Sequence, residues 1–531
     1  MHASYILRAV ASSWVAVLAN AIVGFLLTPY ILHHIGDVEF GLYVVITSLT
    51  GYYGLFDLGV RSAVLRFVSR GLALNDEVEI KRVICSAFYY YLIVCCVVIL
   101  LTILIQPWVP GIFGLSAGTA EAFRSLFLLG GIVQGFTFPL NVFAGSLDAS
   151  GRFDQVYIIQ VLSLLLRTVA VVAVIHAGGR LFAVGAIVMV SIFLSYVFQI
   201  PLALRQVHGI SLNPKWVSRH KLRDMFRYSS VTIGVGLGDK LKTYALPVLV
   251  ALFMNPVAVT IFALPARLLR APTDGIGMMT EVINPMSSHL EARKDYGRLR
   301  QLIQLSAQSA FLLLAALAAF LFIFGRDVLR LWIGAEYTST YPLLVLLTLG
   351  IGCEATQACI QQMLFGMGRH KGLIAFRLGE AGVIFVFGGA MLKFFGLEAY
   401  AFVIALTLVT TSVFLIPRHL CQVLGLSLGA YLKEACLKPC LLTLPFAAVL
   451  CGFHFWISVR SWLGLLSLLA TGSLFHLAVL LSVMFRPWKE SGIRWVSLAV
   501  LDVMAEKARP ALWKLQVFTS SRLRSFANRS V

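Results

Sequence analysis

Charged residues are scarce in this chain of 531 residues: they make up 13% of it, and hydrophobic residues make up 59%. Soluble domains usually contain about 25% charged residues. The shortage excludes a string of soluble domains and predicts a polytopic membrane protein. Membrane spans need about 20 apolar residues each, so the predicted spans take up most of the chain and leave little length for a soluble domain.

Two further absences narrow the class of protein. The nine cysteines contain no CxxC pair and none of the spacing that marks a zinc site, and most lie inside apolar runs, where they are expected to be small buried hydrophobic residues. The first apolar run is too long for a signal peptide and has no Ala-x-Ala exit, so we expect it to be the first membrane span. The sequence predicts no metal and no cofactor.

Apolar runs between charged, proline or glycine positions predict about 14 transmembrane helices in an all-α fold. They lie near residues 10–32, 40–60, 83–105, 122–146, 156–176, 181–203, 228–253, 256–286, 302–324, 341–365, 373–392, 398–417, 439–457 and 462–485.

The net charge of +19 is compatible with a nucleic-acid partner, but basic residues beside membrane spans are the ordinary determinant of topology. With the N-terminus inside, the inner segments hold 31 of the 43 lysines and arginines, and the outer loops hold five. This asymmetry favours topology over nucleic-acid binding. It predicts that both termini are cytoplasmic and that the number of spans is even.

A weak internal repeat, at an offset of about 219 residues, pairs Pro29 with Pro247 and Tyr43 with Phe262. Together with the span count, it predicts the duplicated architecture common in transporters. The expected parts are a six-helix lobe (1–203), a basic cytoplasmic connecting loop (204–227), a second six-helix lobe (228–417), an appended helix pair (418–485) and a basic cytoplasmic tail (486–531). The tail is either an amphipathic segment on anionic membrane lipids or disordered.

Charges inside the predicted spans are functional candidates, because a charged side chain at mid-bilayer costs about 2.5 to 3.5 kcal/mol. In the eighth span, Arg267, Arg270, Asp274 and Glu281 share a stripe about 60° wide on a helix. The stripe either faces a polar cavity or is structural, with Arg270 and Asp274 forming an i,i+4 ion pair.

The seventh span carries Asp239 and Lys242 on one face, whereas Lys240 points elsewhere. The glycines at 234, 236 and 238 precede them; no strand comes before and the spacing is not GxGxxG, so close helix packing is favoured over a phosphate loop. Three other spans each carry charge: Arg167 in the fifth, Glu354 in the tenth, and Arg377 with Glu380 in the eleventh.

Fixed arginines and lysines in a low-dielectric cavity suit an anionic ligand such as phosphate or pyrophosphate. The predicted substrate-binding residues are Arg267, Arg270, Lys240, Lys242, Arg167 and Arg377. The predicted ion-coupling or gating residues are Glu354, Asp274, Glu281, Asp239, Asp57 and Arg61.

Glu354 is the first choice for binding a coupling proton or sodium ion, because it has no obvious basic partner in the sequence. The alternative is that it only hydrogen-bonds Gln357 or a neighbouring helix. Asp57 is expected to form a gate pair with Arg61.

The first two spans resemble a known family. The matching segments are Leu26–Leu32, Glu39–Tyr43 with Gly36 before it, Phe56–Gly59 and Arg66–Val68; looser matches are Leu331–Gly334 and Gly366–Arg369. They resemble the Wzx-type polysaccharide biosynthesis proteins, the O-antigen flippases of the multidrug/oligosaccharidyl-lipid/polysaccharide (MOP) exporter superfamily. The resemblance is specific in the first 70 residues and looser as far as about residue 420.

The resemblance implies a V-shaped transporter of two lobes in the bacterial inner membrane. Its substrate would be an undecaprenyl-pyrophosphate-linked oligosaccharide, moved to the outer leaflet by alternating access for cell-surface polysaccharide synthesis. Membrane lipids and other polysaccharide assembly proteins are the implied partners. The related MurJ-type lipid II flippases carry basic residues early in their first span, but this chain has none there after Arg8. The departure argues against lipid II as substrate.

Three alternatives stay open. A multidrug antiporter of the same superfamily would be served better by acids than by deep basic groups. A membrane glycosyltransferase or polymerase usually needs a sizeable loop outside the bilayer, and the longest outer loops, near 106–121 and 325–340, contain no histidine and few paired carboxylates. A major-facilitator carrier would show a signature with glycine and aspartate that residues 61–82 lack.

Overall fold

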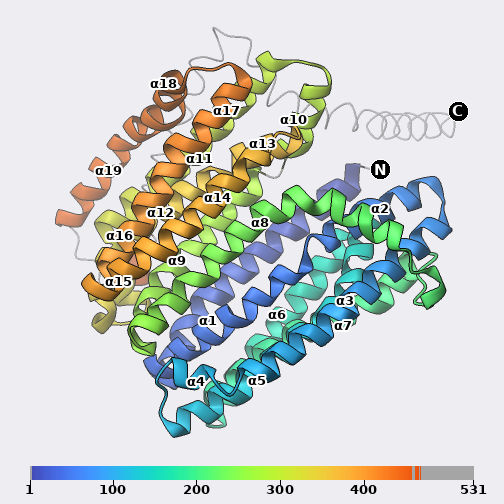
Figure 1. Cartoon of the computed structure of the whole chain (residues 1–531). Helices are drawn as coiled ribbons and strands as arrows, with labels where there is room; N and C mark the ends of the chain where they lie inside the picture. The colour runs from blue at the N-terminus through green and yellow to red at the C-terminus, as the bar shows by residue number, and fades with distance from the viewer. Residues whose placement is uncertain (1–2, 281, 457–460, 466, 468–531) are drawn as a thin grey trace, which may run out of the picture.

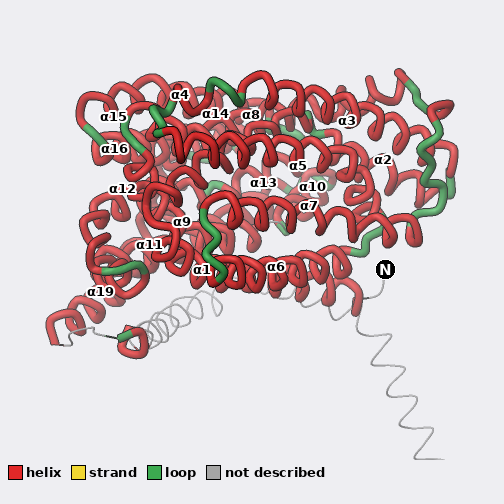
Figure 2. Tube along the Cα trace, turned by 90° about the horizontal axis from the view of Figure 1, so that it is seen from below, coloured by secondary structure: helices red, strands yellow, loops and turns green. Residues whose placement is uncertain are grey.

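The computed structural model of the chain describes residues 3–280, 282–456, 461–465 and 467. Within these residues every regular element is a helix, and Figure 2 shows the helices joined by short loops. The axes of the long helices are roughly aligned, so that the connecting loops gather at the two ends of the bundle (Figure 1). The predicted all-α fold is confirmed.

The helices of the first half pack mainly on one another. The bounds are α1 Ala3–Tyr52, η1 Tyr53–Asp57, α2 Val60–Leu74, α3 Glu77–Ile105, α4 Val109–Ile112, α5 Ala117–Ala149, α6 Phe153–His176 and α7 Leu181–Gln206. The long helix α5 lies between α3 and α7, and α6 packs on α1 and α7.

Helix α1 contains the first two predicted spans, folded back at Gly36. The backbone there leaves the helical conformation, with φ 81° and ψ 169°, which glycine adopts without a steric penalty. After this turn, Gly41 lies against Pro256, Gly51 against Tyr244 and Gly59 against Ser229. The second arm of α1 therefore runs antiparallel to the helix that carries Tyr244 and Ser229, and it forms much of the contact between the two halves.

The second predicted span is longer than expected and is broken in the middle. It continues from α1 through η1 into α2, and Leu58 and Gly59 between them have left-handed backbone angles, φ 44° and φ 68°. Such a break frees backbone carbonyl groups that cannot be left unpaired in a membrane. The Lys240 ammonium of the second half binds the Gly54 carbonyl at 2.5 Å. The Ser229 hydroxyl donates at 2.8 Å to the Gly59 carbonyl, which also accepts from the Ala63 amide at 3.1 Å.

The helices of the second half also pack mainly on one another. Their bounds are η2 Pro214–Trp216, α8 Arg219–Phe253, α9 Pro256–Thr280, α10 Ile283–Ala292, α11 Tyr296–Trp332, η3 Ala335–Thr340, α12 Tyr341–Thr356, α13 Ala358–Gly366, α14 Lys371–Val383, η4 Ile384–Gly388, α15 Gly389–Phe395, α16 Leu397–Val409, η5 Thr410–Leu415, α17 Ile416–Leu424, α18 Leu428–Tyr431, η6 Leu432–Leu437 and α19 Lys438–Trp456. The segments η4, η5 and η6 are π-helical turns.

Ten helical segments of the described residues are long and apolar enough to cross a membrane, and the segment Ser12–Asp57 contains two predicted spans. Helices α8 and α9 are not among the ten, since each carries several charges in its middle. They nevertheless lie where the seventh and eighth spans are predicted. The fourteenth span (462–485) and the tail (486–531) fall almost wholly outside the described residues.

The connection between the halves is shorter than the predicted loop of residues 204–227. Helix α7 continues to Gln206 and α8 begins at Arg219, so only residues 207–218 lie between these two helices. Hydropathy marks the basic residues 219–227 as a loop, but a helix can carry charges beyond the hydrocarbon layer. Lys221 on this extension is held by Glu79 of α3 at 2.5 Å. The division into two lobes that move separately stays a prediction.

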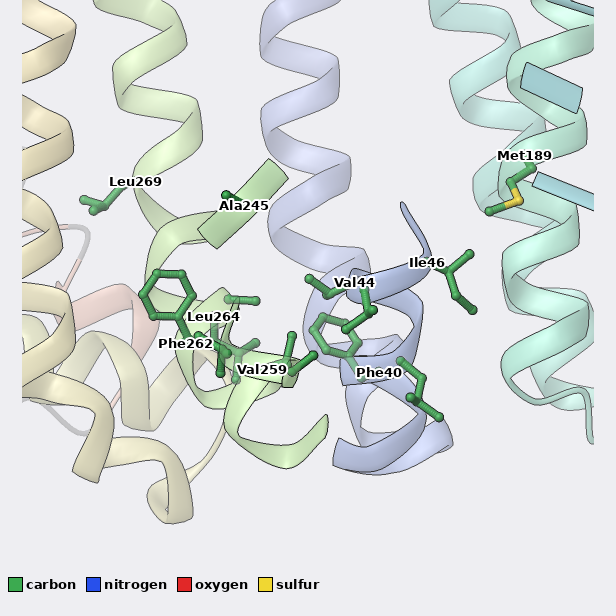
Figure 3. Close-up of a cluster of buried hydrophobic side chains, with 14 of the residues drawn as sticks. Phe40, Val44, Ile46, Met189, Ala245, Val259, Phe262, Leu264 and Leu269 are labelled. Atoms are coloured by element: carbon green, nitrogen blue, oxygen red, sulfur yellow. The ribbon is translucent and has the colours of Figure 1, made fainter. Parts of the chain in front are cut away.

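The outward faces of the bundle are apolar, as expected of helices that contact lipid. Large side chains such as Ile93, Val169 and Phe387 remain 65%, 68% and 63% exposed. Between the halves, Phe40 and Val44 of α1 lie beside Val259 of α9 in a buried apolar cluster (Figure 3).

Candidate functional site

Five charged side chains meet inside the second half and form what we call the ionic cluster: Asp239 and Lys242 of α8, Glu354 of α12, and Arg377 and Glu380 of α14. Lys242 donates to Glu354 and, at 3.0 Å, to Glu380. Arg377 donates to the same two carboxylates at 2.9 and 3.0 Å. Each of the two glutamates therefore accepts from both cations.

Neutral groups complete the ionic cluster. The Thr411 hydroxyl donates to Glu380 at 2.5 Å, and Arg377 donates to the Gln361 side-chain oxygen at 3.2 Å. Gln357, on the turn after α12, donates to the Ser412 carbonyl. Thr411 and Ser412 lie in the π-helical turn η5. Such turns expose backbone groups and are frequent at functional sites.

Two glycines allow α8 and α14 to approach closely enough for these contacts. A Cβ atom at Gly238 would lie 2.7 Å from the backbone carbonyl carbon of Arg377, and one at Gly234 would lie 2.8 Å from the Ile374 side chain. Gly236 faces open space. The prediction that this glycine series serves helix packing is confirmed for Gly234 and Gly238.

The ionic cluster holds three carboxylates and two cations, so it carries one uncompensated negative charge when all five groups are ionised. Lys242, Arg377 and Glu380 are 4%, 3% and 1% exposed. Asp239 is held least well: its side chain is 36% exposed, and its 3.2 Å contact with Arg377 lacks hydrogen-bond geometry. An excess buried charge is costly unless a counter-ion or a proton joins it.

The structure corrects the sequence-based view of Glu354. The prediction that it lacks a basic partner is wrong, since both Lys242 and Arg377 bind it. The contacts of Asp239 are also different from those expected, because its ion pair is with Arg377 rather than with Lys242. Helix periodicity places residues on a face, but it cannot show which distant helix supplies the partner.

A second group of cations lies along the contact between the halves. The Arg267 guanidinium stands 4.7 Å from the ring centre of Phe40 and 5.8 Å from that of Tyr43. Arg167 is partly buried on α6, which packs on α1. Lys240 points away from the ionic cluster, as predicted, and binds the Gly54 carbonyl. We call Lys240 and Arg267 the interface cations; within the described residues neither they nor Arg167 have a carboxylate within ion-pair distance.

The residues of the stripe predicted on the eighth span do not share one environment. Arg267 is partly buried against aromatic rings, whereas Arg270 and Asp274 are 81% and 58% exposed and pair with each other at 3.7 Å. That i,i+4 pair is the one expected from the structural alternative. Glu281 lies outside the described residues.

The expected ion pair between Asp57 and Arg61 is not formed. Asp57 accepts a hydrogen bond from the Tyr91 hydroxyl, and Arg61 donates to Asp148 of α5 at 3.0 Å. Asp57 and Arg61 keep only a weaker electrostatic interaction. The break at Leu58 and Gly59 separates the two residues, so an i,i+4 spacing no longer places them on one helical face.

Several residues that contact the charged groups were not predicted as site residues. Tyr43 and Phe40 lie in the segment that carries the family resemblance, which is the one signal that could have marked them. Thr411 and Asp148 have no distinguishing pattern, because a single threonine or aspartate near the end of a helix is common.

Comparisons with known proteins agree on the kind of fold. A family model described as polysaccharide biosynthesis protein matches residues 6–291. The structure is similar to lipid II flippase MurJ in an inward closed conformation, with a TM-score of 0.70, 13% identity, and coverage of 91% of this chain and 100% of that one. No curated protein matches the chain in sequence.

Multidrug transporters share the fold at similar identity. An inward-facing MATE family transporter of the MOP superfamily matches with a TM-score of 0.59 and 15% identity, covering 78% of this chain and 99% of that one. The Vibrio cholerae MATE transporter VcmN in its bent form matches with a TM-score of 0.56 and 13% identity, covering 81% and 98%. At these identities the likeness shows the fold alone.

Proposed function

The chain belongs to the polysaccharide biosynthesis protein family and has the fold of MOP superfamily transporters, and on this premise we propose that it is a flippase. Its substrate is an undecaprenyl-pyrophosphate-linked oligosaccharide, which it moves across the bacterial inner membrane by alternating access for cell-surface polysaccharide synthesis. Both termini lie in the cytoplasm in this proposal. Other polysaccharide assembly proteins are its expected partners.

The observation that carries the proposal is the set of interface cations. A guanidinium in a membrane needs a partner, and an aromatic ring stabilises it by only about 0.5 to 2 kcal/mol. The rings of Phe40 and Tyr43 therefore hold Arg267 without neutralising it. A backbone carbonyl likewise leaves the Lys240 charge in place. Positive charge at the contact between the halves would attract a pyrophosphate.

A multidrug antiporter is the rival with the same fold. Cationic drugs need carboxylates that are free to bind them, but Glu354 and Glu380 are each already bound by Lys242 and Arg377. The purified protein could be tested for binding of a cationic dye. Displacement of the dye by a cationic drug, but not by an undecaprenyl pyrophosphate lipid, would favour the antiporter.

We do not favour an enzyme. Helices of the bundle take up nearly all of the described residues, which leaves those residues little room for the domain outside the bilayer that membrane glycosyltransferases and polymerases usually need.

We assign ion coupling to the ionic cluster. Its excess negative charge would favour a proton on Asp239, the carboxylate that is held least well, whose side chain is 36% exposed. Lys242 and Arg377 already form ion pairs with the carboxylates of the cluster, so few carboxylate oxygens are left to coordinate sodium, and a proton is favoured. Loss or gain of that charge would change the hold of α8 on α14 and thereby link an ion gradient to movement.

The proposal is tested by complementation of a host strain that lacks the gene. Arg267→Ala should abolish surface polysaccharide and cause lipid-linked glycan to accumulate on the inner leaflet, at normal protein levels. Arg270→Ala should reduce export less, because Arg270 is exposed and already paired with Asp274. Lysine at either position should restore part of the function, because the charge remains but the planar fork is lost. Arg124→Ala is the matched control, since Arg124 is an exposed arginine that donates to the Pro107 carbonyl at 3.3 Å. Normal export by both alanine variants would contradict the proposal.

A further inference from the structure

A cavity of about 640 Å³ lies far along the chain from the interface cations, where the last turns of α11 meet η3, α12 and α19. Its polar lining consists of Arg326, Asp327, Arg330, Thr338, Tyr341 and His454. None of these residues belongs to the interface cations or to the ionic cluster, so the proposed transport site leaves this cavity without a role.

The cavity lies at the level of the lipid headgroups. On α11, residues 301–325 between Arg300 and Arg326 contain no charged side chain. At about 1.5 Å per residue this stretch is roughly 37 Å long, enough to cross a hydrocarbon layer about 30 Å thick. Arg326 therefore stands just beyond the apolar layer, and Ile323, one turn deeper, gives the cavity an apolar floor.

The cavity is at the end of the bundle where α1 folds back. The Tyr337 hydroxyl of η3 donates to Asp37 at 2.5 Å, directly after the turn at Gly36. The N-terminal end of α1 lies at the opposite end of the bundle (Figure 1). With a cytoplasmic N-terminus, as in the proposed function, the cavity opens at the outer leaflet.

The charged groups of the cavity are arranged to bind an anion. Arg326 and Arg330 share one face of α11, four residues apart. Asp327 pairs with Arg330 at 2.8 Å, whereas the Arg326 guanidinium is stacked 5.0 Å from the ring centre of Tyr341. The stacking fixes the plane of Arg326 without neutralising its charge. Among the lining residues, two arginines against one aspartate leave a net positive charge.

We propose that this cavity binds the phosphate of a lipid headgroup in the outer leaflet. An oriented guanidinium and a second arginine four residues away suit phosphate oxygens. The apolar floor suits the first carbons of a lipid. The phosphate belongs either to a polyprenyl pyrophosphate that has been transported or to an anionic phospholipid. The outer location and the first of these sources rest on the proposed function, whereas the chemistry of the cavity does not.

Lipid binding to the purified full chain tests the proposal. In detergent, the probes are undecaprenyl pyrophosphate, dioleoylphosphatidylglycerol and the zwitterionic dioleoylphosphatidylcholine, and native mass spectrometry measures the occupancy. The double variant Arg326→Gln/Arg330→Gln should bind the anionic probes at least tenfold more weakly than the wild type. Arg124→Gln, an exposed arginine elsewhere in the chain, should bind as the wild type does.

The outcomes separate the sources of phosphate. Preferential loss of undecaprenyl pyrophosphate binding identifies a site for transported lipid, and equal loss of both anionic probes identifies an anionic-phospholipid site. Wild-type binding by the double variant overturns the proposal, and so does equal binding of phosphatidylcholine and the anionic probes by the wild type. Arg326→Lys keeps the charge and should lose less than the double variant, which guards against a folding defect. Failure of the flippase proposal would show in the Arg267→Ala export test and leaves the phosphatidylglycerol arm unaffected.

Discussion

Replacing Lys242 with methionine removes the ammonium group of the ionic cluster while keeping an unbranched side chain. The wild-type ammonium contacts Glu354 and lies 3.0 Å from Glu380, and it is 4% exposed. At 3.0 Å and an effective dielectric constant of about 20, one such attraction amounts to about 5.5 kcal/mol. The desolvation cost of the ammonium, several kcal/mol, disappears with it.

The net loss should be about 3 to 5 kcal/mol of unfolding free energy, because breaking a buried pair from one side leaves an uncompensated charge. In Lys242→Met, three carboxylates would face one guanidinium. Neutralising one of them should then recover stability. The double variant Lys242→Met/Glu354→Gln is therefore expected to be more stable than the sum of the single losses, with a coupling of about 1 to 3 kcal/mol.

Steric trapping or reversible unfolding in mixed micelles measures the four free energies of this cycle. The control cycle replaces Lys240, two residues away on α8, whose ammonium binds the Gly54 carbonyl instead of a carboxylate. Lys240→Met and Glu354→Gln should be additive within about 0.5 kcal/mol. If the Lys242 cycle is equally additive, the ionic cluster does not act as a unit and the reasoning fails.

Three further predictions follow from the same contacts. Gly238→Val should lower the unfolding free energy by at least about 1 to 3 kcal/mol, because the new Cβ atom would lie 2.7 Å from the Arg377 backbone. Gly236→Val is the control: its side chain has open space, so the unfolding free energy should change little. Asp239→Asn should abolish the dependence of vesicle transport on an imposed proton gradient; full retained dependence on both proton and sodium gradients would remove this assignment. A reporter fused after residue 531 should be cytoplasmic and one inserted at residue 336 periplasmic, and a periplasmic C-terminus would refute the 14-span topology.

The sequence by itself determined the membrane class, the helical fold and the positions of the spans on the described helices. Hydropathy reports the length of an apolar run, and a run of about 20 residues has few alternatives to a helix in lipid. The same signal was poor at boundaries, because basic helix extensions such as residues 219–227 have the composition of loops. Hydropathy did identify the charged residues of the ionic cluster, because charged residues inside a membrane span are rare and therefore conspicuous.

Tertiary structure alone decided which of those charges meet. Glu354 and Arg377 are 23 residues apart and Lys242 and Glu354 are 112 apart, so no local periodicity could join them in one ionic cluster. Two glycines on α8 set how closely α14 approaches. The break at Leu58 and Gly59 prevents Asp57 and Arg61 from sharing one helical face, and it leaves the Gly54 carbonyl to accept a hydrogen bond from Lys240. An ion pair depends on a few ångströms of separation between helices, and that separation is fixed by packing across the whole bundle.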